Sequence, residues 1–285
     1  MDLEAIFEPV SEELELVERE LKTAMSRIGA SNAEHQSRLG ILPGIVTHPF
    51  AVPGKRIRPA LVLLASRAVD GSFPREPLIN LAAAVEVLHA ASLVHDDIID
   101  SAEERRHQVS LNKRFGNRVA VLAGDILYTH FFSLVTNLPQ VSPELRLSIL
   151  DLFINTTQAM CIGEILAQEV GAETEPLSFR DYLEISSDKT ASLFAACCES
   201  AGMVVGAGRE RERQLREFGL GFGLTFQMVD DLMDKDHGLP ESVDLLAQTQ
   251  TWAQKARDQA STFPAGEYRN RFVSLIDYVL EQIDA

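Results

Sequence analysis

A long segment that is apolar on almost every helix face constrains this chain more than any other feature. Residues 77–101 repeat at helical period, and residues 81–94 within them carry apolar side chains on nearly all sides. A helix with that pattern belongs in the middle of a helical bundle, because no face of it favours water. The segment therefore predicts a bundle with this helix at its centre.

The other long segments also repeat their apolar residues at helical period. Leu14, Val17, Leu21 and Met25 form the stripe of a first helix. Further helices are expected over residues 59–68, 117–134, 143–170, 179–205 and 210–234. No alternating run bounded by turns indicates a strand, and neither an internal repeat nor a low-complexity linker divides the chain. We predict an all-α fold that forms a single domain over residues 1–285.

The charge balance excludes one class of partner. The chain has 42 acidic and 26 basic side chains, which give a formal net charge of −16. A surface this acidic repels phosphate backbones, so we expect no nucleic-acid partner.

The cysteines and the first residues bear on location. Cys161, Cys197 and Cys198 have neither metal-ligand nor disulfide spacing, which fits a reducing compartment. The acidic, amphipathic first 20 residues do not resemble a signal peptide. No uncharged apolar stretch of about 20 residues predicts a membrane span. We expect a cytoplasmic protein.

Two carboxylate clusters are the sharpest chemical features. Asp96, Asp97 and Asp100 close the long apolar helix at spacings of three and four, which place carboxylates on one helix face. The same pattern recurs at residues 230–234, after the apolar run 222–229. Such carboxylates need a counter-charge, and Mg²⁺ suits them because it bridges carboxylates to phosphate groups. One cluster alone would equally fit a solvated helix end, but the matched pair favours a metal site.

Two basic clusters stand against the acidic background. Residues 54–59, GKRIRP, place three cations within four positions, and Arg105 and Arg106 follow the first carboxylate cluster. Either cluster alone is typical of a solvated surface. Together with the carboxylates they indicate two anionic ligands, one held through metal and the other held directly by guanidinium and ammonium groups.

These motifs resemble those of the trans-type isoprenyl diphosphate synthases, also called polyprenyl synthetases. The motifs are GKRIRP (54–59), LVHDDIID (93–100), ERRHQ (104–108), FGNRVAVLAGDILY (115–128), Lys189-Thr190-Ala191 and FQMVDD (226–231). Each is weak or moderate alone, but six in the family's order are strong. The resemblance implies an isoprenoid-synthase helical bundle with a central apolar cavity, Mg²⁺ as cofactor and a homodimer.

The resemblance also implies a role for each matching residue. Mg²⁺ on the allylic diphosphate would be held by Asp96, Asp97, Asp100 and Asp230, with Asp231 and Asp234 in support. The diphosphate of isopentenyl diphosphate would be bound by Lys55, Arg58, His89 and Arg106. Arg105 and Lys189 would contact the allylic diphosphate, and Thr190 and Gln227 would lie near the reacting carbons. A lone histidine such as His89 is also common as a satisfied core residue.

The implied reaction condenses isopentenyl diphosphate with an allylic prenyl diphosphate into a linear all-trans polyprenyl diphosphate. The allylic diphosphate ionises, the alkene attacks the cation, and a proton is lost. Ala91 and Ser92 lie one turn deeper than Asp96 and are both small. In the family, bulky residues there stop the product short, so a product longer than farnesyl is expected.

The sequence departs from the family after Asp236. The family's lysine-bearing segment is absent, and Lys235 is a weak candidate to replace a lost diphosphate contact. Either the segment is truly deleted, or a stretch of chain is missing from the sequence. A catalytically weakened or regulatory subunit, which binds prenyl diphosphates or a partner synthase, is the alternative function. A terpene cyclase is disfavoured, because those enzymes usually lack GKRIRP and the paired arginines.

Overall fold

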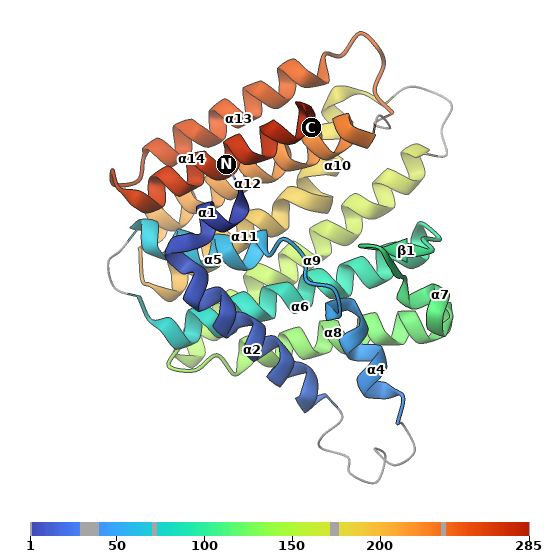
Figure 1. Ribbon diagram of the computed structural model, residues 1–285. Coiled ribbons are helices and arrows are strands. Elements are labelled where there is room, and N and C mark those ends of the chain that lie inside the picture. The colour runs from blue at the N-terminus through green and yellow to red at the C-terminus, as the bar shows by residue number, and fades with distance from the viewer. Residues whose placement is uncertain (1, 29–39, 70–72, 172–176, 235–237, 285) are drawn as a thin grey trace. The chain divides into compact units, whose positions relative to one another are not determined.

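The computed structural model describes residues 2–28, 40–69, 73–171, 177–234 and 238–284, and these residues are mostly helical (Figure 1). The all-α prediction is therefore confirmed. The described elements are α1 (Leu3–Phe7), η1 (Glu8–Val10), α2 (Ser11–Arg27), α4 (Leu42–Thr47), η2 (His48–Phe50), α5 (Ile57–Val69), α6 (Arg75–Ile99), β1 (Glu104–Arg105), β2 (Gln108–Val109), α7 (Leu111–Phe115), α8 (Asn117–Thr136), α9 (Pro143–Gly171), α10 (Phe179–Ser186), η3 (Ser187–Ala191), α11 (Ser192–Val204), α12 (Arg209–Asp234), α13 (Leu245–Ser261), α14 (Glu267–Glu281) and η4 (Gln282–Asp284).

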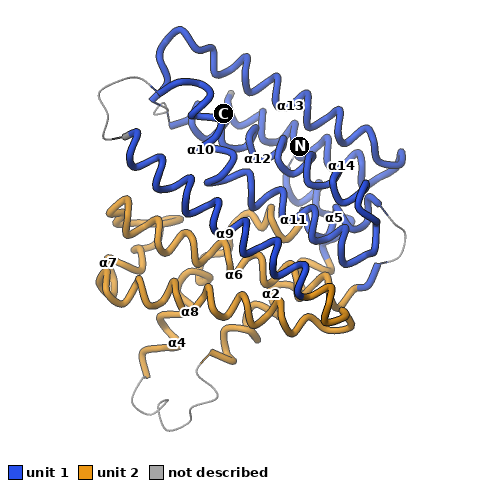
Figure 2. The backbone as a smooth tube through the Cα atoms, turned by 180° about the vertical axis from the view of Figure 1, so that it is seen from behind, with its two compact units in different colours: residues 1–11, 61–74, 147–285 blue, residues 12–60, 75–146 orange. Residues whose placement is uncertain are grey.

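The chain divides into two compact units, which Figure 2 shows in different colours. Unit 1 comprises residues 1–11, 61–74 and 147–285, and unit 2 comprises residues 12–60 and 75–146. The first carboxylate cluster belongs to unit 2 and the second to unit 1. That the chain forms a single domain stays a prediction.

The centre of unit 2 is α6, the helix predicted from its apolar faces. It packs along α8, and its buried residues include nearly every position from Leu78 to Ala91. Its C-terminal end is held by Asn112, whose side-chain amide donates to the backbone carbonyls of Asp97 and Ala102, both at 3.1 Å. The Ala102 amide also donates to the Asp97 carbonyl, at 2.9 Å, so several bonds fix the chain where the carboxylate cluster ends α6.

The core of unit 1 lies around α12, which packs against α11 and α13. The rings of Phe218 and Phe272 stack with centroids 4.1 Å apart, and Phe194 meets Phe222 edge to face at 5.3 Å. Gly219 brings α12 close to α11, since a β-carbon there would lie 2.5 Å from the carbonyl oxygen of Phe194. Aromatic packing and close backbone contact thus fix α12, which carries the second carboxylate cluster.

Two local predictions are wrong. Residues 104–109 form a short antiparallel hairpin, in which Glu104 pairs with Val109 and Arg105 with Gln108. Two residues per strand are too few to show an alternating pattern, and the turn contains no glycine or asparagine to signal it. The helix expected over residues 179–205 is interrupted by the π-helical turn η3, which helical periodicity does not reveal.

Three described helices, α6, α8 and α9, are long and apolar enough to cross a membrane by length and composition alone. The apolar window of α6 is 83% buried inside the protein, whereas those of α8 and α9 are 39% and 28% buried. The absence of a membrane span therefore stays a prediction.

Candidate functional site

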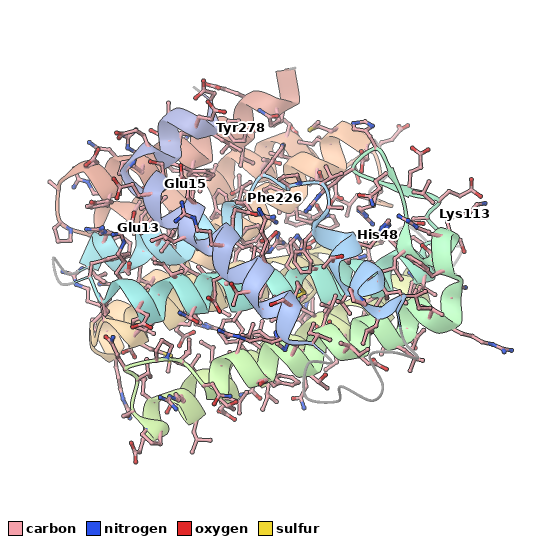
Figure 3. All side chains as sticks on the ribbon, turned by 60° about the horizontal axis from the view of Figure 1, so that its bottom comes forward. Glu13, Glu15, His48, Lys113, Phe226 and Tyr278 are labelled. Carbon is pink, nitrogen blue, oxygen red and sulfur yellow. The ribbon has the colours of Figure 1, made fainter. Side chains whose placement is uncertain are left out.

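A pocket in unit 2 gathers several of the predicted site residues. It has an empty volume of about 520 Å³, its mouth included. The side chains lining it include His89 and Asp97 from α6, Arg105 and Arg106 from the hairpin, and His48 from η2, which Figure 3 labels. Arg105 and Arg106 thus bring two guanidinium groups to an otherwise largely apolar hollow, which suits the binding of an anionic group.

The three cationic side chains of the GKRIRP segment have different roles. Arg58 Nη1 lies 3.2 Å from His89 Nε2 and so reaches a residue of the pocket, while Lys55 is exposed. Arg56 forms ion pairs with Glu18 and Glu86. These two carboxylates outweigh burial and raise the pKa of Arg56. Arg56 is therefore a structural cation, held in a left-handed conformation with φ 54°.

His89 is held neutral by its surroundings. Burial is the main cause that lowers its pKa well below the usual value, and the positive charges of Arg58, Arg106, Arg105 and Arg56 act in the same direction. A neutral imidazole can donate one hydrogen bond and accept another. His89 is thus suited to contact an anion without adding charge.

The depressed pKa of His89 predicts a pH dependence of stability. Below about pH 6.5 the unfolded chain takes up a proton that the folded protein does not, so unfolding becomes easier by up to about 1.4 kcal/mol per pH unit. We expect His89→Gln to lose less stability than the wild type between pH 7 and pH 5, as measured by urea unfolding. His107→Gln, on the exposed hairpin turn, controls for the loss of an imidazole. Equal losses in the wild type and His89→Gln would contradict the assignment.

In the first carboxylate cluster, the inner aspartate differs from the outer two. Asp97 is only 4% exposed, and its Oδ1 accepts hydrogen bonds from Arg105 Nε at 2.8 Å and Nη2 at 2.5 Å. Burial raises the pKa of Asp97, although Arg105 acts in the opposite direction. Asp96 is half-buried and Asp100 is exposed, one helical turn apart. Asp97 therefore orients Arg105, while Asp96 and Asp100 occupy a more accessible face.

The second cluster, in unit 1, repeats this arrangement. Asp231 accepts hydrogen bonds from the Tyr182 hydroxyl at Oδ2 and from Gln227 Nε2 at Oδ1, the latter at 2.9 Å. Thr190 Oγ1 in turn donates to Gln227 Oε1 at 2.7 Å. Asp230 and Asp234 are exposed. The structure thus joins Thr190, Gln227 and Asp231, three predicted site residues, in one chain of hydrogen bonds.

Tyr182 belongs to this network although the sequence did not single it out. Its side chain is buried, and burial together with the Asp231 carboxylate raises the pKa of its hydroxyl. The only signal in the sequence is spacing, because Tyr182 lies seven residues, about two helical turns, before Lys189. That spacing alone does not distinguish a site residue from a core residue.

Lys189 also has a partner that the sequence did not indicate. Its Nζ lies 2.6 Å from Glu164 Oε2, and Glu164 is buried on α9. The neighbouring Gly163 permits this approach, since a β-carbon there would lie 2.5 Å from the backbone nitrogen of Lys189. The wide turn η3 and α9 together fix the ammonium group.

The residues proposed to set product length lie where α6 is buried. Ala91 is fully buried, and the Ser92 hydroxyl donates to the His89 carbonyl at 2.9 Å. Their influence on product length stays a prediction.

The described chain that follows α12, from Gly238 onward, packs into a small apolar cluster. Lys235 lies outside the described residues. Leu239 and Leu245 pack with Tyr182 and Met228 in that cluster, and Gly238 adopts φ 63°, which glycine tolerates. The connection is thus anchored next to the residue that binds Asp231.

The carboxylates fit a cation that completes its coordination with phosphate oxygens. Among the described residues, no three carboxylate, imidazole or thiol side chains gather into a metal centre. Each cluster nonetheless offers two accessible hard oxygen ligands one turn apart. Mg²⁺ commonly uses one or two carboxylates, water and substrate phosphates, so this donor set suits Mg²⁺ bound together with a diphosphate.

Comparison with known proteins identifies related chains. The polyprenyl synthetase family model matches residues 40–241. A prenyl transferase of Synechocystis sp. is 38% identical over 232 residues, which cover 81% of this chain and 66% of that protein. Heptaprenyl diphosphate synthase component 2 of Geobacillus stearothermophilus is 34% identical over 254 residues, or 86% of this chain and 72% of that protein. The matches span 52–66% of the length of the first four curated relatives.

The fold has close counterparts among solved structures. A polyprenyl synthase from Caulobacter crescentus CB15, complexed with calcium and isoprenyl diphosphate, matches with a TM-score of 0.84 at 25% identity. The match covers 98% of this chain and 97% of that chain. The helical architecture therefore has precedent among solved structures.

Proposed function

Because the chain belongs to the polyprenyl synthetase family, we propose that it condenses isopentenyl diphosphate with an allylic prenyl diphosphate to give a linear all-trans polyprenyl diphosphate. The observation that carries this proposal is the pocket of unit 2, where Arg105, Arg106 and neutral His89 meet beside a carboxylate cluster. A condensation of two diphosphates needs a second group of residues that binds a diphosphate. A cyclase has only one substrate diphosphate and does not need such a group.

In the proposed reaction, the bond between the allylic carbon and the diphosphate oxygen breaks and leaves an allylic cation. The alkene of isopentenyl diphosphate forms the new carbon–carbon bond, and the resulting cation loses a proton to the released diphosphate. Arg105, oriented by Asp97, stabilises negative charge on the leaving group. The hydroxyl of Thr190 and the amide of Gln227 lie on a fixed hydrogen-bonded chain, where they stabilise positive charge near the reacting carbons.

The proposed cofactor is Mg²⁺, which when bound neutralises the departing diphosphate. The ligands would be the accessible outer carboxylates, Asp96 with Asp100 and Asp230 with Asp234. The inner aspartates would orient Arg105 and Gln227 through the hydrogen bonds described above. The calcium bound in the Caulobacter crescentus structure supports a divalent cation in this fold.

The direct test of the proposed function is incubation with labelled isopentenyl diphosphate, farnesyl diphosphate and Mg²⁺, followed by chromatography of the products. Elongated prenyl diphosphates are expected, and their formation should stop with EDTA and resume with added Mg²⁺. No elongation from any allylic primer would overturn the assignment.

Product length provides a further prediction. Relatives of this chain are named octaprenyl and decaprenyl diphosphate synthases, which supports a product longer than farnesyl. Ala91 is a fully buried small residue one turn before the carboxylates, so Ala91→Phe should block the growing tail. We expect chromatography to show shorter products with little loss of total condensation. An unaltered product distribution would contradict the role of Ala91, and Ala123→Phe on α8 is the control for adding a buried ring.

The proposed homodimer would use an apolar stripe on α9. The members of this stripe are exposed large aliphatic residues that share one helix face: Leu147, Ile154, Ile162 and Ile165. A second copy of the chain is the occupant we propose, since an exposed apolar stripe of this kind marks an association surface. Sedimentation should give a dimer for the wild type and a monomer for Ile162→Glu with Ile165→Glu.

The second candidate function is a weakened or regulatory subunit. It is favoured by the shortened connection after α12, which lacks the family's lysine-bearing motifs. The relative named heptaprenyl diphosphate synthase component 2 supports it, because that name implies a partner component. Binding of diphosphates without elongation, restored to full activity by a second protein, would favour this candidate.

A further inference from the structure

The hairpin that carries Arg105 and Arg106 cannot be stable by itself. Each strand has two residues, whereas an isolated two-stranded hairpin is marginal even when longer. Both turn residues are left-handed, with φ 53° at Arg106 and 60° at His107. Residues other than glycine rarely adopt this backbone conformation, because it brings the β-carbon too close to the following carbonyl oxygen. Contacts outside the hairpin must therefore hold it.

His48 supplies such contacts from a distant part of unit 2. It is 8% exposed, and its Nε2 lies 2.8 Å from the carbonyl oxygen of Val109. A carbonyl only accepts, so Nε2 donates and Nδ1 is the acceptor. Gln108 Nε2 lies 2.9 Å from Nδ1, and Arg114 Nη1 lies 3.4 Å from it. One imidazole therefore holds both residues of strand β2.

The first strand and the turn of the hairpin carry the two arginines that line the pocket. Arg105, the strand partner of Gln108, donates to Asp97. The Arg106 guanidinium lies against Gly54 of the GKRIRP segment, where a β-carbon would be 2.6 Å from its central carbon. A side chain at residue 54 would therefore displace Arg106. Asp97 and Gly54 thus restrict the positions of Arg105 and Arg106, respectively. Movement of strand β2 would shift both of them.

We propose that His48 is a positioning residue: it pins the strained hairpin so that Arg105 and Arg106 are preorganised for a diphosphate. The proposal rests on the proposed function for the identity of the ligand, but not for the pinning itself. His48 lies outside the motifs that carry the family resemblance. Its effect passes through the backbone of Val109 and the side chain of Gln108 to the arginines.

The test uses trypsin, which cleaves after arginine, as a probe of hairpin opening in the whole protein. His48→Phe keeps a ring that can meet Phe115 edge to face, as His48 does at 6.0 Å, but removes both nitrogens. Cleavage after Arg105 and Arg106 should become about tenfold faster, the size expected from losing buried hydrogen bonds. His48→Gln, whose amide can still donate to Val109 and accept from Gln108, should restore most of the protection. His130→Phe on α8 is the control for the same change elsewhere in unit 2.

The kinetic readout separates positioning from general stability. If the condensation is confirmed, His48→Phe should raise KM about tenfold for both isopentenyl diphosphate and the allylic primer. It should lower kcat much less than Asp97→Ala does, because Asp97 still pairs with Arg105. Wild-type cleavage rates in His48→Phe would overturn the proposal, as would equal acceleration in His130→Phe. Faster cleavage in a protein that condenses nothing would instead overturn the proposed function and leave the pinning established.

Discussion

Asp97→Ala is expected to lower kcat by about a hundredfold to a thousandfold or more, the range for removing a preorganised charged group from an active site. The carboxylate is 4% exposed and receives two hydrogen bonds from Arg105. Without it, Arg105 loses its fixed orientation and its negative partner at once. Steady-state kinetics with isopentenyl diphosphate and an allylic primer would measure the change.

Two further variants define what is lost. Asp97→Asn keeps the shape of the side chain but not its charge. It should retain more activity than Asp97→Ala only if the orientation of Arg105 matters more than the negative charge of residue 97. Asp151→Ala, on the exposed face of α9, is the control for removing a carboxylate. Near-wild-type kcat in Asp97→Ala would refute the role of this cluster in turnover.

Gly219→Ala should strongly destabilise the core of unit 1. The added β-carbon would lie 2.5 Å from the Phe194 carbonyl oxygen and 2.7 Å from the Ala195 α-carbon. Backbone atoms cannot rotate away, so α11 and α12 must separate, at a cost of about 3 kcal/mol, the upper end for overpacking. Urea unfolding would measure the loss of unfolding free energy.

Gly44→Ala is the matched control for this prediction. It lies in helix α4, and a β-carbon there would meet nothing within 4 Å. Replacing such a helical glycine should instead stabilise the protein by about 0.5–1 kcal/mol. Similar effects of the two substitutions would show that intrinsic helix propensity, not the approach of α11 to α12, decides the result at Gly219.

The sequence predicts the features that depend on local pattern. Helix α6 is predictable because an all-round apolar segment has few alternatives, and the aspartates at its end follow from spacing alone. The same holds for α12 and Asp230. In both cases the side chains are placed by helix geometry, which relates residues only a few positions apart in the sequence.

The partners of these side chains could not be predicted, because they come from distant segments. Asp231 is held by Tyr182, 49 residues away, and the hairpin by His48, about 60 residues away. Neither residue lies in a motif, and the turn at Arg106 is held by tertiary contacts against its own backbone preference. Contacts that oppose local preference leave no signal in a periodicity analysis.

The wide turn η3 makes residues 187–191 sensitive to changes in chain length during evolution. A π-helical turn holds one residue more than an α-helical turn, so losing one residue there would restore regular α-helical winding and leave the helix beyond it in place. Lys189 lies within the turn and would lose its position beside Glu164, whereas Phe194 would keep its contact with Phe222. Descendants of this chain that lose the extra residue should therefore also lose the ion pair between Lys189 and Glu164.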